Sequence, residues 1–166
     1  MPDGIPRVAT DEYVRFLVTA APEPHRLYAI LGAYAGLRCV DISRLQREHI
    51  SAERIHVVRS KRNKTRLVPM HPDIWQAVRD LPAGPVTDRS PRQISTNFFR
   101  FCQRRGMVSM SHHRLRGWYA SRSYRHSKNL LAVKQNMGHS HPNTTARYIE
   151  LDEDQVQAAV DGLPRF

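Results

Sequence analysis

The apolar and polar positions of the chain alternate mainly with a helical period, and one pair of short strands lies near the middle. Apolar residues recur every three or four positions, which is typical of helices that bury one face. This spacing and the capping residues predict helices that begin at or near Asp11, His25, Asp41, Pro72, Pro91, Ser111, Leu130, Thr144 and Asp152. The sequence therefore predicts an α+β fold, mainly α-helical with a small antiparallel β-sheet.

The first helix has a clear start and a clear inner face. Thr10 has the hydroxyl that a helix N-terminus requires, and the two acidic residues after it suit the positive end of the helix dipole. At helical spacing, Tyr13, Phe16 and Leu17 would form its buried side. Two prolines then end the helix.

Glycines set two further helix ends. Gly36 interrupts the second helix, so Arg38 is expected at a bend between two helical pieces. Gly138 follows a helix predicted over 130–137, in the position that favours a left-handed residue. His139 would then lie just beyond the end of that helix.

Two β-branched stretches predict a hairpin with a basic tip. Residues 55–59 and 65–69 have the composition of strands, and Ser60–Lys64 would form the turn between them. Cations on this hairpin could contact phosphate groups, as could Arg114 on the helix near Ser111. The predicted hairpin contacts are Arg59, Arg62, Lys64 and Arg66.

The chain carries a large positive charge. Its 166 residues include 26 Lys and Arg against 15 Asp and Glu, for a net charge of +11 and a pI of about 10.5. Arginine accounts for 22 of the cations. A surplus of this size on one small domain indicates a polyanionic partner such as nucleic acid, although a solvated basic surface is the plainer alternative.

The cysteine content argues against a zinc or redox site of the Cys-x-x-Cys type, and the lack of a long apolar run argues against a secreted or membrane-spanning protein. Cys39 and Cys102 do not form a Cys-x-x-Cys pair, so we expect buried, reduced thiols. The N-terminus lacks the apolar run of a secretory signal, and nowhere do 18 apolar residues follow one another. We therefore expect a cytoplasmic, nucleoid-associated protein with no membrane contact.

Six residues could hold a phosphodiester and attack it without a metal or other cofactor. Two arginines can each donate a planar pair of hydrogen bonds to the oxygens of a phosphate, and a tyrosine supplies the nucleophile. Two histidines and a lysine can move protons and stabilise developing charge. In chain order the six are Arg38, Lys61, His113, Arg116, His139 and Tyr148.

Taken singly, these residues have plainer explanations. The guanidinium of Arg38 could simply pair with Asp41, and Lys61 could be one cation in a solvated turn. His113 could be a satisfied histidine near a helix start, and Tyr148 could be a core residue. A shared catalytic role for the six residues is therefore indicated only by their order and spacing along the chain.

Four motifs around these residues resemble those of the tyrosine recombinases, or phage integrases. The motifs are Gly36–Leu45, Ser60–Pro69, His113–Arg116 and Met137–Ser140. Arg116 precedes His139 by 23 positions, and His139 precedes Tyr148 by 9, separations similar to those of the family. Four motifs in the same order make a chance match improbable.

The resemblance implies a mechanism. Tyr148 would attack a phosphodiester of double-stranded DNA, expel a 5′-hydroxyl and form a 3′-phosphotyrosyl bond, so the strand can be rejoined without ATP or metal. Arg38 and Arg116 would neutralise the phosphate. His113 and His139 would donate to the phosphate or move the tyrosine proton, and the division of these roles stays open.

The resemblance also assigns two supporting roles. Asp41, three places after Arg38, would support the active site. The alignment favours Lys61 over Lys64 as the catalytic lysine, which would protonate the leaving oxygen.

The family further implies an organisation. Residues 1–166 would form a single catalytic domain, without the N-terminal DNA-clamping domain that recombinases usually carry. Residues 152–166 would form a tail helix that packs on its own domain or is exchanged between protomers of a tetramer on DNA. The target site, the reaction direction and accessory proteins stay open.

Three other functions are compatible with some of these residues. A metal-dependent phosphodiesterase could use His112, His113, His139 and His141, but adjacent histidines on a helix point apart and no carboxylate has ligand-like spacing. A DNA-binding module without activity could use the same cations. A type IB topoisomerase would share the covalent chemistry but would relax supercoils without site preference.

Overall fold

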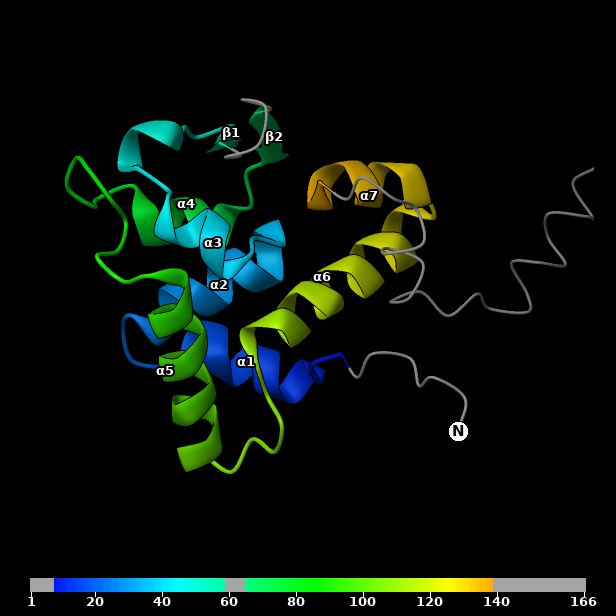
Figure 1. The fold of residues 1–166 in the computed structure, drawn as a ribbon. Helices are drawn as coiled ribbons and strands as arrows, with labels where there is room; N and C mark the ends of the chain where they lie inside the picture. Colours follow the sequence, from blue (N-terminus) through cyan, green and yellow to red (C-terminus); the bar gives the residue numbers. More distant parts are fainter. Residues whose placement is uncertain (1–7, 59–64, 139–166) are drawn as a thin grey trace, which may run out of the picture.

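The fold is mainly helical with one antiparallel hairpin, as predicted (Figure 1). A computed structural model of the chain describes residues 8–58 and 65–138. Its elements are α1 (Asp11–Thr19), α2 (His25–Ala35), α3 (Cys39–Ser43), the 3₁₀ turn η1 (Arg47–His49), β1 (Arg54–Val58), β2 (Thr65–Pro69), α4 (Pro72–Val78), α5 (Pro91–Arg104), α6 (His112–Ser127) and α7 (Leu130–Met137). The helices predicted near Thr144 and Asp152 lie outside the described residues.

Side-chain caps fix the starts of three helices. The hydroxyl of Thr10 accepts a hydrogen bond of 3.3 Å from a backbone N–H of α1. Ser90 and Gln93 cap α5 reciprocally, each side chain accepting from the other residue's backbone N–H. Asn129 accepts a 3.0 Å bond from a backbone N–H of α7. These contacts satisfy donors that a helix N-terminus leaves unpaired, and the predicted starts are confirmed.

Two predicted boundaries are wrong by one or two residues. The first strand begins at Arg54, one residue before the predicted start. The helical piece after the first bend begins at Cys39, earlier than Asp41, because Arg38 already occupies its N-cap position with extended backbone. The prediction that Arg38 lies at a bend between helical pieces is confirmed.

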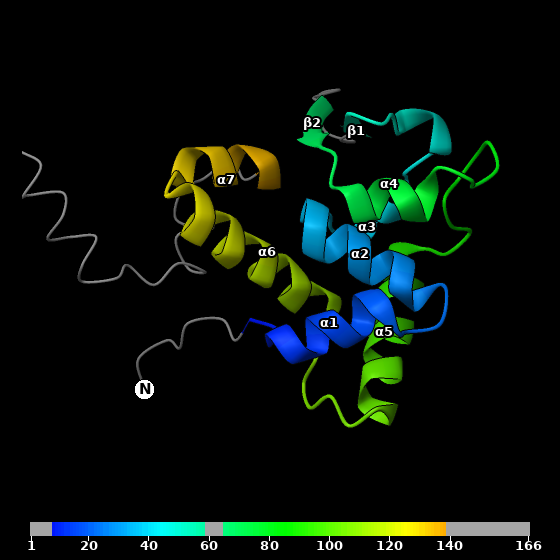
Figure 2. The same cartoon turned by 180° about the vertical axis from the view of Figure 1, so that it is seen from behind.

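Helix α2 lies at the centre of the described structure (Figures 1 and 2). It contacts α1, α4, α5 and α6, and from Leu27 to Ala35 only Tyr34 is not fully buried. On α1 the buried residues are Val14, Leu17 and Val18. Tyr13 and Phe16, which were expected on that face, are only half-buried.

The hairpin lies against this core through one face. Val58 pairs with Thr65 and Arg54 with Pro69 in an antiparallel register. The inward-facing residues Ile55, Val57 and Val68 are buried, whereas His56 and Leu67 are exposed. Strand β2 also contacts α7, so the hairpin and the end of α7 lie close together.

Gly36 provides a stability test of the bend that follows α2. Its φ is 59°, and a Cβ there would lie 2.6 Å from Cδ1 of Tyr119. We expect Gly36→Ala to lower the free energy of unfolding by about 2–4 kcal/mol, because left-handed strain adds to displacement of a packed ring. Gly106 also has a positive φ, of 72°, but a Cβ there meets nothing within 4 Å.

Gly106→Ala is therefore the matched control and should lose only about 1 kcal/mol, from strain alone. Both values come from denaturant unfolding of the variants. Equal losses would show that Tyr119 does not restrict the backbone at the bend.

Candidate active site

Arg116 joins the C-terminal ends of two helices. Its side chain is 1% exposed. One terminal nitrogen, Nη1, donates to the carbonyl of Gly36, and Nη2 donates to the carbonyl of Met137 at 2.7 Å. Both carbonyls lie at helix C-termini, where the dipole is negative and a cation is stabilised. Arg116 thereby fixes the bend that carries Arg38 and the helix end that precedes residue 139.

Asp41 supports the bend from the other side. Its Oδ2 accepts a 3.0 Å hydrogen bond from the backbone N–H of Arg38 and lies 3.3 Å from Nη2 of Arg66. The carboxylate thus holds the backbone of Arg38, and its ionic partner is Arg66. Within residues 8–58 and 65–138, the guanidinium of Arg38 makes no ion pair. The plainer explanation, in which the Arg38 guanidinium pairs with Asp41, does not describe this structure.

Arg66 lies in a different setting from the one expected of a hairpin cation. Its side chain is only 9% exposed and pairs with Asp41. Strand alternation could have indicated this, because Arg66 lies two residues before the buried Val68 and therefore on the same face. Its role in DNA binding stays a prediction, as does that of Arg114, which is half-buried on α6.

His113 lies within the electrostatic reach of both arginines. It is one residue into α6 and its side chain is exposed to solvent on one side. Partial desolvation, followed by the positive charges of Arg116 and Arg38, lowers the pKa of His113. The neutral form of the His113 side chain is therefore favoured. The structure thus brings together three of the six predicted residues: Arg38, His113 and Arg116.

His112 points into the core, away from its neighbour. Its Nε2 lies 3.0 Å from the carbonyl oxygen of Tyr28. Burial, together with the positive charge of Arg116, lowers the pKa of His112 to about 4, although the bond to Tyr28 opposes the shift. Across the described ranges, no three His, Cys, Asp or Glu side chains gather in a way that could hold a metal ion.

The buried His112 predicts an acid-sensitive fold. The unfolded chain takes up a proton with a pKa near 6.5, whereas folded His112 does so only near 4, so the unfolded state binds more protons between these values. We expect the free energy of unfolding to fall by about 2 kcal/mol from pH 7.5 to pH 5 through His112 alone. His112→Gln should reduce this fall, as measured by denaturant unfolding at both pH values.

Ile30→Val is the control for that experiment. Ile30 is buried and does not titrate, so the variant should lose stability equally at both pH values. An unchanged pH dependence in His112→Gln would contradict the assignment.

The two cysteines are free, and Cys102 is buried as expected, while Cys39 is half-buried. Burial raises the pKa of Cys39 to about 11 and that of Cys102 to about 12. Neither side chain is a thiolate at neutral pH, so neither is an activated nucleophile.

Tyr119 is a site residue that sequence analysis missed. Its ring lies against Gly36. Burial raises the pKa of Tyr119, and the charges of Arg66 and Arg116 partly offset the effect. The sequence could have indicated this position, because Tyr119 follows Arg116 by three residues and the two side chains therefore lie on one face of the helix.

Six of the predicted residues lie outside the described part of the chain: Arg59, Lys61, Arg62, Lys64, His139 and Tyr148. Their neighbours are described on both sides of the hairpin tip and up to Gly138. The assigned roles of these six residues stay predictions.

Comparison with known proteins identifies the family. The model of the phage integrase family matches residues 6–155. The chain belongs to this family. Tyrosine recombinase XerC of Chromohalobacter salexigens is 31% identical over 96% of the chain and 61% of its own length. Tyrosine recombinase XerA of Thermococcus kodakarensis is 26% identical over 96% of the chain and 63% of its own length. The chain thus spans about three fifths of the length of these phage integrase relatives.

Solved structures of the family share the fold. The crystal structure of XerA recombinase matches 99% of the chain and 68% of its own chain, with a TM-score of 0.78 and 19% identity. The structure of XerH site-specific recombinase bound to its difH substrate matches 98% of the chain and 55% of its own chain, with a TM-score of 0.76 and 16% identity. The catalytic domain of bacteriophage HP1 integrase matches 95% of both chains, with a TM-score of 0.74 and 18% identity. The mainly helical fold with a small sheet is therefore that of an integrase catalytic domain.

Proposed function

We propose that this chain is the catalytic domain of a site-specific DNA recombinase that cuts and rejoins strands through a 3′-phosphotyrosyl intermediate. The observation that carries the proposal is the convergence of Arg38, His113 and Arg116 at one bend, in a chain of the phage integrase family. Arg38 and His113 could contact a phosphate directly, and the buried charge of Arg116 acts on His113. Tyr148 is the proposed nucleophile.

Arg38 and Arg116 have different proposed roles at the phosphate. Arg38 lies at the surface end of the bend with its backbone held by Asp41, so its fork of N–H donors can meet the non-bridging oxygens. Arg116 is buried beneath, where its charge stabilises the transition state and its bonds hold both helix ends in place. Such preorganised donors account for roughly 100-fold or more in rate.

The proton transfers are assigned to the remaining residues. Neutral His113 can accept the phenolic proton or donate an N–H to the phosphate. Lys61 would protonate the 5′-oxygen as it leaves, and His139 would complete the set of donors around the phosphate. No metal is required, because the cations of the chain neutralise the developing charge.

Double-stranded DNA is the proposed partner. The net charge of +11 supports it, as do the relatives solved with DNA, among them XerH with its difH substrate and the Tn1549 transposon integrase with transposon right end DNA. We further propose assembly as a tetramer on DNA, with residues 152–166 exchanged between protomers, and a cytoplasmic, nucleoid-associated location. None of the helices in the described ranges is long and apolar enough to cross a membrane.

A covalent-adduct assay in excess chelator tests the proposal. We expect the protein, incubated with labelled nicked DNA that carries its target site, to form a denaturant-resistant adduct at the same rate with and without EDTA. Cleavage that stops with chelator would instead support a metal-dependent phosphodiesterase. Relaxation of supercoiled plasmid without site preference would favour the topoisomerase alternative.

A further inference from the structure

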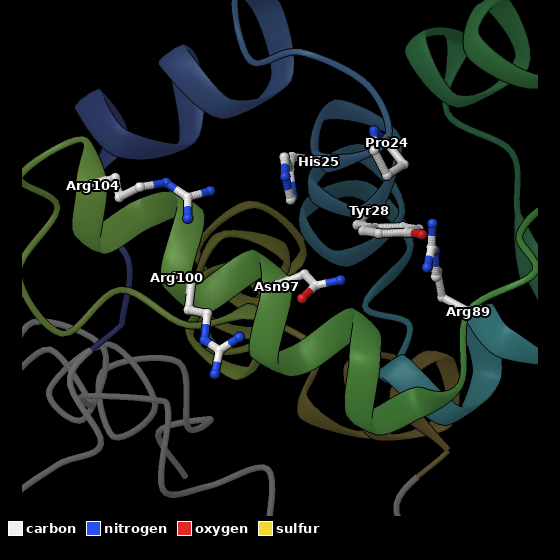
Figure 3. A pocket seen from close by; sticks show the side chains of 7 residues that line it. All are labelled: Pro24, His25, Tyr28, Arg89, Asn97, Arg100 and Arg104. Atoms are coloured by element: carbon white, nitrogen blue, oxygen red, sulfur yellow. The ribbon is translucent and has the colours of Figure 1, made fainter.

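A basic groove lies between α5 and the first turns of α2, away from the active site. Its volume is about 270 Å³, and its lining residues are Pro24, His25, Tyr28, Arg89, Asn97, Arg100 and Arg104. Figure 3 shows the α2 residues on one wall and the α5 residues on the other, with Arg104 reaching toward His25 and Arg89 beside Tyr28. Tyr28 and His25 precede Gly36 by eight and eleven residues on α2, so the groove lies about 12–16 Å along the helix axis from the bend.

The charge of the groove comes from a helix without acidic residues. The sequence of α5, PRQISTNFFRFCQR, contains three arginines and no carboxylate. Within the described ranges, Arg100 and Arg104 make no ion pair, whereas Arg89 pairs with the exposed Asp88 at 3.2 Å. Arg105 is engaged elsewhere, over the ring of Phe16 at 5.8 Å. Two cations at this groove therefore lack a counter-ion from the described protein.

One wall of the groove is fixed by packing. The ring of His25 stacks on Phe101 with centroids 4.4 Å apart. The hydroxyl of Tyr28 lies 2.7 Å from Oγ1 of Thr87, which also accepts a 3.2 Å bond from the backbone N–H of Arg89. The α2 side of the groove is thus held in place by packing, whereas Arg100 and Arg104 on the α5 side are exposed.

The row of polar side chains indicates an extended anion. Asn97, Arg100 and Arg104 follow one another along two turns of α5, a span of about 10 Å. A single compact anion would contact one or two of them, whereas successive phosphates of a strand could contact all three. We infer that this groove binds the phosphate backbone of DNA outside the cleavage site, as a second contact of the catalytic domain with its substrate.

This inference rests on the proposed function for its choice of ligand, but its test does not require cleavage. The test measures binding of the full chain to a 30-base-pair duplex of mixed sequence, by fluorescence anisotropy over a series of salt concentrations. The double variant Arg100→Gln, Arg104→Gln removes the two cations without a counter-ion. Arg15→Gln, Arg79→Gln is the matched control, since it removes the same charge from exposed positions on α1 and at the end of α4.

The Arg100→Gln, Arg104→Gln protein, the groove variant, is expected to bind DNA at least about 10-fold more weakly at 0.1 M salt. The slope of the logarithm of its DNA-binding constant against the logarithm of the salt concentration should fall in magnitude by about 1.8. The control should change the affinity less than about 3-fold. Equal changes in the two double variants would overturn the inference, because general charge would then explain binding. Thermal unfolding of both variants checks that the fold is kept.

Inorganic pyrophosphate distinguishes a free anion from a DNA backbone. The inference is overturned if the unsubstituted protein binds pyrophosphate in calorimetry and the groove variant does not, while the two proteins bind DNA with equal affinity. The groove would then be a site for small anions. A weaker, less salt-dependent DNA complex of the groove variant supports it. This result would stand even if the parent formed no covalent adduct, which would count against the proposed function alone.

Discussion

Tyr148→Phe is expected to form no covalent complex with DNA. Phenylalanine keeps the ring but lacks the oxygen that would attack the phosphodiester, so the rate of adduct formation should fall by roughly 10⁴-fold or more. The measurement is the fraction of end-labelled nicked DNA that migrates with the protein on a denaturing gel. Binding of intact DNA should be retained, because the cations that contact phosphates are unchanged.

Tyr13→Phe is the control for the loss of a phenol. Tyr13 is half-buried on α1, and its removal should leave the rate of adduct formation unchanged. A Tyr148→Phe protein that still forms the adduct would show that another side chain is the nucleophile.

Arg116→Lys is expected to damage both chemistry and folding. Lysine keeps the charge, but a single ammonium cannot reproduce the planar fork that donates to the carbonyls of Gly36 and Met137. A buried carbonyl left without its donor should lower the free energy of unfolding by about 1–3 kcal/mol. The rate of adduct formation should fall by about 100-fold or more, because the bend and the end of α7 lose their connection.

Arg125→Lys, on the exposed side of the same helix, is the matched substitution. It should change stability by less than about 0.5 kcal/mol and leave adduct formation at saturating DNA unchanged. The measurements are denaturant unfolding and single-turnover cleavage. If Arg116→Lys behaved like Arg125→Lys, the two carbonyl contacts would not be important for the site.

The ends of the helices could be predicted from the sequence because they depend on nearby residues. Thr10, Ser90 and Asn129 each cap a helix through a side chain and a backbone group three residues away. The order of the recombinase motifs likewise requires only the linear sequence. Such local signals predicted α5 and α7 with correct first residues and placed Arg38 at a bend.

The partners of the charged residues could not be predicted, because they come from distant parts of the chain. Arg66 was predicted as a DNA contact of the hairpin, and it is paired with Asp41, 25 positions earlier. Arg116 was predicted to neutralise the phosphate, but nothing in the sequence indicated that its terminal nitrogens bond to the carbonyls of Met137 and Gly36. The packing of α2, α6 and α7 brings together the partners of Arg116, and the packing of β2 near α3 brings Arg66 to Asp41.

This packing gives a physical account of how the site is assembled. Two helix C-termini, at Gly36 and Met137, converge on one buried cation, and the next residues along each chain segment include Arg38 and His139. A single arginine therefore holds both the bend that carries Arg38 and the C-terminal end of α7. Gly36 adopts the left-handed conformation of the bend without strain, and the ring of Tyr119 packs against it.

The most direct measurement is the identity of the two atoms joined in the covalent complex. The adduct formed on DNA labelled at a single internal phosphate is digested with protease and nuclease, and the labelled peptide is sequenced by mass spectrometry. The account predicts a peptide that contains Tyr148 joined to a 3′-phosphate, with a free 5′-hydroxyl on the released strand. A label on any other residue, or on a 5′-phosphate, would contradict it.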